Sequence, residues 1–157
     1  MALLRFALVL AHAGVAAVWL GAMAYSLAVV QPRAARLLGP ERYEQFAAVV
    51  ADGARWAVLA MCGVLAATGF GLVAVALAAG HPGPGWLALA TAKTVVLCAA
   101  LAVFTHVSWS LWPRRVFALP PELPALHRAF RRAALTLVAL VGAEFVLGVA
   151  ASTHLVA

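Results

Sequence analysis

The chain has 157 residues, of which 66% are hydrophobic and only 10% are charged. Soluble domains have about 45–50% apolar and about 25% charged residues, so this composition indicates an integral membrane protein and excludes a soluble catalytic domain. The net charge of +6 could indicate nucleic-acid binding. The arginines bracket apolar stretches, however, so we expect the lipid bilayer and its anionic headgroups as partners, and no nucleic acid.

Four apolar stretches are each long enough to cross a bilayer, because about 20 helical residues cover about 30 Å of hydrocarbon. They run over residues 3–30, 55–79, 86–112 and 133–156. The first follows Arg5 and continues without a small-residue cleavage site, which favours a retained span over a signal peptide. We therefore predict an all-α fold: one membrane domain, residues 1–157, forming an antiparallel four-helix transmembrane bundle. No internal repeat is visible in the sequence.

The connections predict where helices begin and which side they face. Gly39, Pro40 and Glu41 supply a stop, a first-turn proline and an acidic N-terminus, so the second helix should begin near residue 40, well before its apolar span. The third connection, residues 113–132, should lie along the inner interface. Nine arginines surround the first and third connections, whereas residues 80–85 contain no Lys or Arg. The positive-inside rule then places both termini outside.

Three ionisable side chains fall at similar depths in the outer half of the apolar spans. His12, Lys93 and Glu144 fall at about 13, 10 and 18 Å from the outer ends of their spans, counted at 1.5 Å per residue. A charged group at the centre of a span costs about 2.5–3.5 kcal/mol, so such a residue suggests a function. We expect the three to share one pocket, whose mouth His154 could extend. His106 falls near the opposite end.

Each of these residues also has a structural interpretation. Lys93 and Glu144 could form a buried ion pair that sets helix register, or Lys93 could extend outward and leave Glu144 protonated. His12 could be a neutral imidazole bonded to a neighbouring helix. Thr68 is expected to bond back to its own helix.

At these residues the chain resembles a known family. Helix one carries an H-x6-W-x-G pattern from His12 through Trp19 to Gly21, which resembles the opening of the copper resistance protein D (CopD) membrane domain. Further matches are, in order, Arg55, Thr68-Gly69, the approach from Trp86 to Lys93, and Arg132 followed by Glu144.

The resemblance implies a multi-pass protein of the bacterial cytoplasmic (inner) membrane that takes part in copper transport or homeostasis. It also implies that His12, Lys93 and Glu144 bind the cofactor or metal. His12, Glu144 and His154 are the candidate ligands, and Lys93 balances charge.

Two alternatives stay open. The chain also resembles HemJ-type membrane oxidoreductases, which use a His in the first span and a Lys in a later one. That resemblance implies haem b bound through His12. The third possibility is a non-catalytic accessory subunit of a respiratory or copper-enzyme complex, or a homo-oligomer, for which so little extramembrane mass is adequate.

Overall fold

In a computed structural model, residues 2–80 and 83–154 are described, with side chains as far as residue 150. Every regular element in these ranges is helical, and the long helices carry short π-helical turns, η1 and η2. This confirms the all-α prediction. The elements are α1 (Ala2–Tyr25), η1 (Ser26–Val30), α2 (Gln31–Leu37), α3 (Pro40–Ala79), α4 (Pro84–His106), η2 (Val107–Leu111), α5 (Trp112–Val116) and α6 (Leu123–His154).

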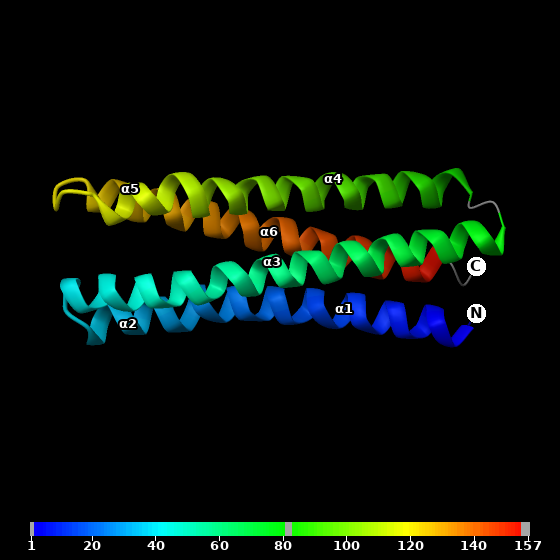
Figure 1. The fold of residues 1–157 in the computed structure, drawn as a ribbon, viewed down its shortest axis with the longest axis horizontal. Helices are drawn as coiled ribbons and strands as arrows, with labels where there is room; N and C mark the ends of the chain where they lie inside the picture. Colours follow the sequence, from blue (N-terminus) through cyan, green and yellow to red (C-terminus); the bar gives the residue numbers. More distant parts are fainter. Residues whose placement is uncertain (1, 81–82, 155–157) are drawn as a thin grey trace. The chain divides into compact units, whose positions relative to one another are not determined.

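The helices pair into two compact units, Met1–Ala79 and Gly80–Ala157. In the first hairpin, α1, η1 and α2 form one uninterrupted helix that packs antiparallel against α3. In the second hairpin, α4, η2 and α5 do the same against α6 (Figure 1). Each hairpin therefore joins its two long helices by a short turn.

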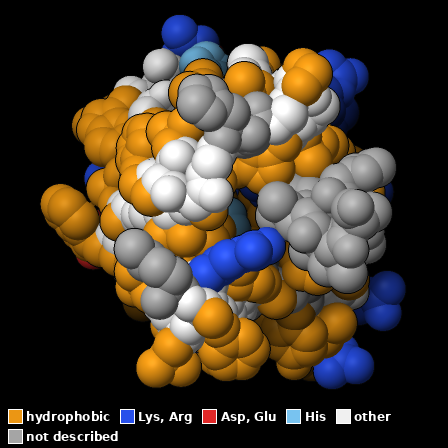
Figure 2. All heavy atoms as spheres, turned by 90° about the vertical axis from the view of Figure 1, so that its right-hand side faces the viewer, with side chains coloured by type: hydrophobic (Ala, Val, Ile, Leu, Met, Phe, Trp, Pro, Cys, Tyr) orange, Lys and Arg blue, Asp and Glu red, His pale blue; other side chains and the backbone are white. Residues whose placement is uncertain are grey.

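All four long helices are apolar enough to cross a membrane: Ala2–Leu37, Pro40–Ala79, Pro84–Val116 and Leu123–Ala150. Large apolar side chains such as Leu3, Phe6 and Phe70 are exposed, and orange hydrophobic atoms cover much of the face in Figure 2. Soluble proteins rarely expose contiguous apolar surface of this kind. The prediction of a multi-pass membrane protein is confirmed, and the outside location of the termini stays a prediction.

Two helices begin earlier than the apolar spans they contain. Helix α3 begins at Pro40, as predicted, with Glu41 in its first turn, and runs unbroken for 40 residues. Helix α6 begins at Leu123, ten residues before the predicted fourth span. Its start is favoured by Pro124, which needs no backbone partner in a first turn. The backbone N–H groups of Ala125 and Leu126 donate to the Glu122 carbonyl, which closes that turn. The third connection is therefore shorter than expected.

Each hairpin contains a π-helical turn that ends just before a proline. A proline inside an α-helix has no N–H and its ring collides with the carbonyl four residues earlier. Here the N–H of Gln31 donates to the Ser26 carbonyl, and that of Trp112 to the Val107 carbonyl, so the hydrogen bonds span five residues. This wider turn lets the helix continue through Pro32 and Pro113.

The two hairpins share this construction at matching positions. Val107 and Pro113 follow Ser26 and Pro32 by 81 residues in each case. The same spacing relates two buried residues, Trp19 (2% exposed) and Ala100 (1% exposed). On the returning helices, buried Leu65 and Val141 lie 76 residues apart. The structure thus shows a repeat of architecture that was not predicted from the sequence.

Close packing in the first hairpin predicts a position that tolerates no large residue. A Cβ atom on Gly71 would lie 3.2 Å from the side chain of Leu8 on α1. We expect Gly71→Leu to lower the free energy of unfolding by about 1–3 kcal/mol through overpacking, measured by thermal or denaturant unfolding in detergent micelles. Gly63 on the same helix is the matched control, because apart from its own turn no described atom lies within 4 Å of a Cβ placed there. Equal losses in Gly71→Leu and Gly63→Leu would contradict the prediction.

Candidate functional site

Two polar pairs join the helices within the hairpins. His12 on α1 pairs with Thr68 on α3 in the first hairpin, and Lys93 on α4 pairs with Glu144 on α6 in the second. Lys93 follows His12 by 81 residues and Glu144 follows Thr68 by 76. These are the spacings that relate the buried residues of the two hairpins. The two pairs therefore occupy the same position in the repeated architecture.

The His12 imidazole is oriented by a chain of hydrogen bonds. Its Nδ1 lies 2.8 Å from the Thr68 hydroxyl, and that hydroxyl lies 2.7 Å from the Val64 carbonyl. If the hydroxyl donates to the carbonyl, it accepts from Nδ1–H, because it has a single hydrogen. Metal-ligating histidines are commonly oriented by an outer hydrogen bond of this kind.

Gly69 completes the surface against which the His12 ring lies. A Cβ atom at Gly69 would be 3.6 Å from Cε1 of His12, which is ordinary van der Waals contact. The structure therefore brings together three residues that the sequence pattern contained separately: His12, Thr68 and Gly69. The back-bond of Thr68 to its own helix is confirmed, and its bond to His12 was missed. Counting depth would have found it, since Thr68 lies about 17 Å from the end of its span at Ala79.

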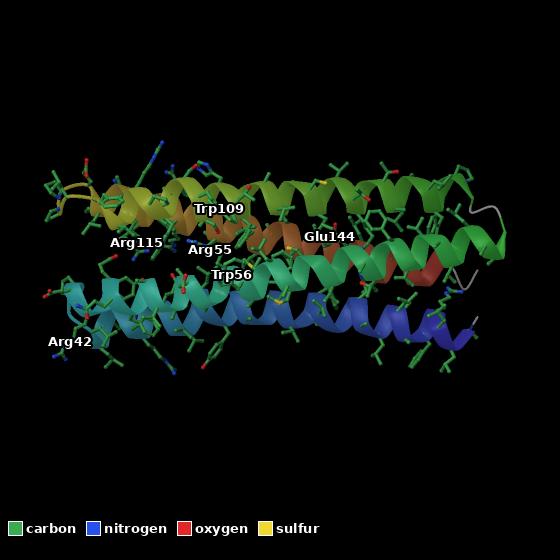
Figure 3. The ribbon with its side chains drawn as sticks, viewed as in Figure 1. Arg42, Arg55, Trp56, Trp109, Arg115 and Glu144 are labelled. Carbon is green, nitrogen blue, oxygen red and sulfur yellow. The ribbon has the colours of Figure 1, made fainter. Side chains whose placement is uncertain are left out.

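Lys93 and Glu144 form an ion pair in the second hairpin. The Lys93 ammonium lies 2.9 Å from Oε2 of Glu144, and the two side chains are only 21% and 15% exposed. The ammonium also donates to the backbone carbonyl of Glu144 at 3.1 Å. Figure 3 shows Glu144 on α6 where that helix faces α4. The sequence-based prediction of an ion pair is confirmed, and the alternative of an outward-pointing Lys93 is wrong.

Gly148 leaves room for the contact between the Lys93 ammonium and the backbone carbonyl of Glu144. It lies one helical turn after Glu144, and a Cβ placed on it would be 3.4 Å from the Lys93 ammonium. A larger side chain would compete for the space beside the Glu144 carbonyl. The ammonium is therefore fixed by one carboxylate oxygen and one backbone oxygen of the same residue.

Two buried polar atoms have no hydrogen-bond partner among the described residues: Oε1 of Glu144 and Nε1 of Trp19. Leaving such an atom unsatisfied costs about 1–3 kcal/mol. In native proteins such an atom is usually satisfied by water or an ion, or it has a functional role. Each hairpin thus contains one such atom, the Trp19 donor in the first and the Glu144 acceptor in the second.

The remaining predicted site residue is His154. It lies in the last turn of α6, and its side chain is outside the described residues. Among residues whose side chains are described, no three His, Cys, Asp or Glu form a group able to hold a metal ion. The metal set of His12, Glu144 and His154 stays a prediction, as does the shared pocket of His12, Lys93 and Glu144.

No protein-family model matches the chain, and neither the curated proteins nor the solved structures include one that is significantly similar to it. The two polar pairs are therefore the features that carry the functional proposal. One pair presents an imidazole oriented by a hydroxyl, and the other presents a carboxylate with one oxygen in an ion pair with Lys93.

The ion pair predicts strong coupling between its members. Lys93→Met or Glu144→Gln alone strands the other group in a low-dielectric hairpin, and each should lower the free energy of unfolding by about 3–5 kcal/mol. The double variant should lose much less than the sum, because it strands no charge. Denaturant unfolding of the four proteins in detergent micelles measures the coupling. Additive losses would show that the two groups do not pair.

The hydrogen bond between Thr68 and His12 predicts that Thr68 influences the tautomer of the His12 ring. In Thr68→Val the partner of Nδ1 disappears, so the tautomer equilibrium should change and the protein should lose about 1 kcal/mol of stability. The ¹⁵N chemical shifts of His12 in histidine-labelled protein report the tautomer. Thr94→Val is the matched control, since the Thr94 hydroxyl donates to the Ala90 carbonyl of its own helix. Unchanged His12 shifts in Thr68→Val would disprove the assigned hydrogen bond.

Proposed function

We propose that this chain is a CopD-like protein of the bacterial cytoplasmic membrane that takes part in copper transport or homeostasis, with copper as its cargo. The observation that carries the proposal is the hydrogen-bond chain from His12 Nδ1 through the Thr68 hydroxyl to the Val64 carbonyl. A metal-ligating histidine needs its ring held in one orientation, and these hydrogen bonds to His12 support such a role.

The donor set supports the same proposal. Imidazole nitrogen suits copper, and Cu(II) accepts nitrogen and oxygen ligands. His12 supplies the imidazole, Glu144 has a buried carboxylate oxygen with no partner among the described residues, and His154 is the third candidate ligand. Lys93 forms an ion pair with the other Glu144 oxygen. This pairing balances the carboxylate charge inside the membrane, where no water solvates it. Ionisable residues inside spans commonly mark ion pathways.

Haem b is the second candidate, and the same feature of His12 favours it. A HemJ-like membrane oxidoreductase would bind haem iron through a histidine of a helical hairpin, and an axial histidine is likewise oriented by a hydrogen bond at Nδ1. Two turns beyond His12, helix α1 also carries a buried hydrogen-bond donor, the indole N–H of Trp19, which has no partner among the described residues. The two candidates therefore differ in the group bound rather than in the residue that binds it.

Elemental analysis and a visible spectrum of the purified protein separate the candidates. We expect the copper-loaded protein to retain metal through gel filtration, and His12→Ala to lose at least about tenfold in affinity while keeping its helix content. His106→Ala is the matched control, because His106 is an exposed histidine at the end of α4.

Three other results would contradict the copper proposal. A Soret band lost in His12→Ala would assign haem instead. Equal copper content in wild type and His12→Ala would make His12 structural. Loss of copper in His106→Ala to the same extent would mean that the metal binds exposed histidines without a defined site.

A further inference from the structure

The turn end of the second hairpin is far more basic than that of the first. Residues 112–132 contain five arginines and one acidic residue, a net charge of +4. Residues 31–55, at the corresponding end of the first hairpin, contain four arginines and three acidic residues, a net charge of +1. The repeated architecture makes this a comparison of equivalent places. An excess of three positive charges belongs to one hairpin alone.

The single acidic side chain of that segment has a structural task. Oε2 of Glu122 accepts the backbone N–H of Leu119 at 2.9 Å, which closes the turn ahead of α6. The exposed arginines of the segment are Arg114 on α5 and Arg128, Arg131 and Arg132 on the first turns of α6.

Arg115 is held in place by aromatic rings. Its guanidinium carbon lies 5.5 Å from the ring centre of Trp112 and 5.2 Å from that of Phe130, and these rings meet edge to face at 5.9 Å. Figure 3 shows Arg115 on α5 near the turn. Contact through the ring faces orients a planar guanidinium whose five N–H donors lie along its edge. That geometry matches two oxygens of one phosphate group.

The turn beside these arginines is apolar and exposed. Val116, Phe117 and Leu119 expose 60%, 84% and 65% of their surface, respectively. Apolar side chains contribute nothing to the binding of a soluble phosphate, whereas a phospholipid has acyl chains directly beneath its headgroup. Arginines at the level of the phosphates and apolar side chains next to them fit both parts of one lipid molecule.

From these observations we infer that the turn end of the second hairpin, residues 112–132, is a binding site for the phosphodiester headgroup of an anionic phospholipid. The α6 arginines supply the attraction, and Arg115, fixed by Trp112 and Phe130, supplies a directed contact. The first hairpin lacks both the charge excess and the equivalent aromatic pair, since Gln31 stands 81 residues before Trp112 and Ala54 stands 76 residues before Phe130. Lipid binding at this end is thus a property of one repeat.

Native mass spectrometry of the full chain in detergent, titrated with phosphatidylglycerol or phosphatidylcholine, tests this inference. Each arginine near a lipid surface contributes about fivefold to affinity, so glutamine at Arg128, Arg131 and Arg132 together should weaken phosphatidylglycerol binding about 100-fold. The matched control replaces Arg33, Arg36 and Arg42 by glutamine and removes the same charge from the first hairpin. It should change binding less than about fivefold.

Two further arms separate a directed site from general attraction. Arg115→Lys keeps the charge but loses the planar fork, and should weaken phosphatidylglycerol binding about fivefold without changing helix content by circular dichroism. Glycerol phosphate, which has no acyl chains, should not displace the lipid at equal concentration. If the triple α6 variant does not purify as a folded protein, Arg115→Lys alone decides.

The inference is overturned by any of three results. The two triple variants could lose affinity equally, which would show general charge attraction. Arg115→Lys could bind phosphatidylglycerol as wild type does, which would leave the aromatic pair without a role in lipid binding. Glycerol phosphate could displace the lipid, which would point to a soluble phosphate ligand. None of these results bears on copper or haem, which are tested at His12.

Discussion

Hydrocarbon offers no water to a polar group, so each polar group inside these four helices needs a partner from the protein itself. The backbone meets this requirement by forming a helix in each of the four membrane-length segments. Threonine hydroxyls meet it by bonding to carbonyls one turn back, as Thr91, Thr94 and Thr105 do. His12 and the Lys93–Glu144 pair meet it across the two helices of a hairpin. Two buried atoms, Nε1 of Trp19 and Oε1 of Glu144, have no partner among the described residues, and native proteins usually satisfy such atoms with water, an ion or a functional contact.

The two hairpins meet this constraint at the same position with different chemistry. The first uses an imidazole and a hydroxyl, His12 and Thr68, which are joined by a hydrogen bond. The second uses an ion pair, in which one Glu144 oxygen and the adjacent carbonyl hold Lys93. Charge buried in this way is costly when one member is lost, so the second pair constrains the chain more tightly than the first. A repeated scaffold thus carries two pairs that need not do the same work.

Sequence patterns predicted the features that depend on hydropathy, chain length and helix signals. The four membrane-length helices and the start of α3 at Pro40 follow from apolar runs and a first-turn proline. The Lys93–Glu144 ion pair was one of the interpretations that the sequence left open. The bond from Thr68 to His12 was not predicted, because a hydroxyl in a span is adequately explained by its own helix. The early start of α6 was also missed, since arginines and prolines disguise a helix that extends beyond its apolar part.

The repeat could not be found from the sequence for a different reason. Where lipid surrounds a helix, Leu, Val, Ala and Phe satisfy the same requirement, so equivalent positions need not keep the same residue. Trp19 and Ala100 are equally buried and have nothing in common in size. Pro32 and Pro113 keep the same residue at equivalent places, and the other positions that do so are mostly Leu, Val and Ala, which recur throughout the chain.

The π-helical turn before each of these prolines also changes which way the chain faces. Successive α-helical residues are about 100° apart around the axis, and a π-helical turn holds about one residue more than an α-helical turn. Residues beyond Val30 and Leu111 are therefore rotated by roughly a quarter of a turn from where an unbroken α-helix would direct them. A helical wheel that starts at His12 or Lys93 therefore gives wrong directions for the side chains beyond Val30 and Leu111. The short basic segments α2 and α5 can in this way face a different direction from the membrane helices they continue, with no break in the rod.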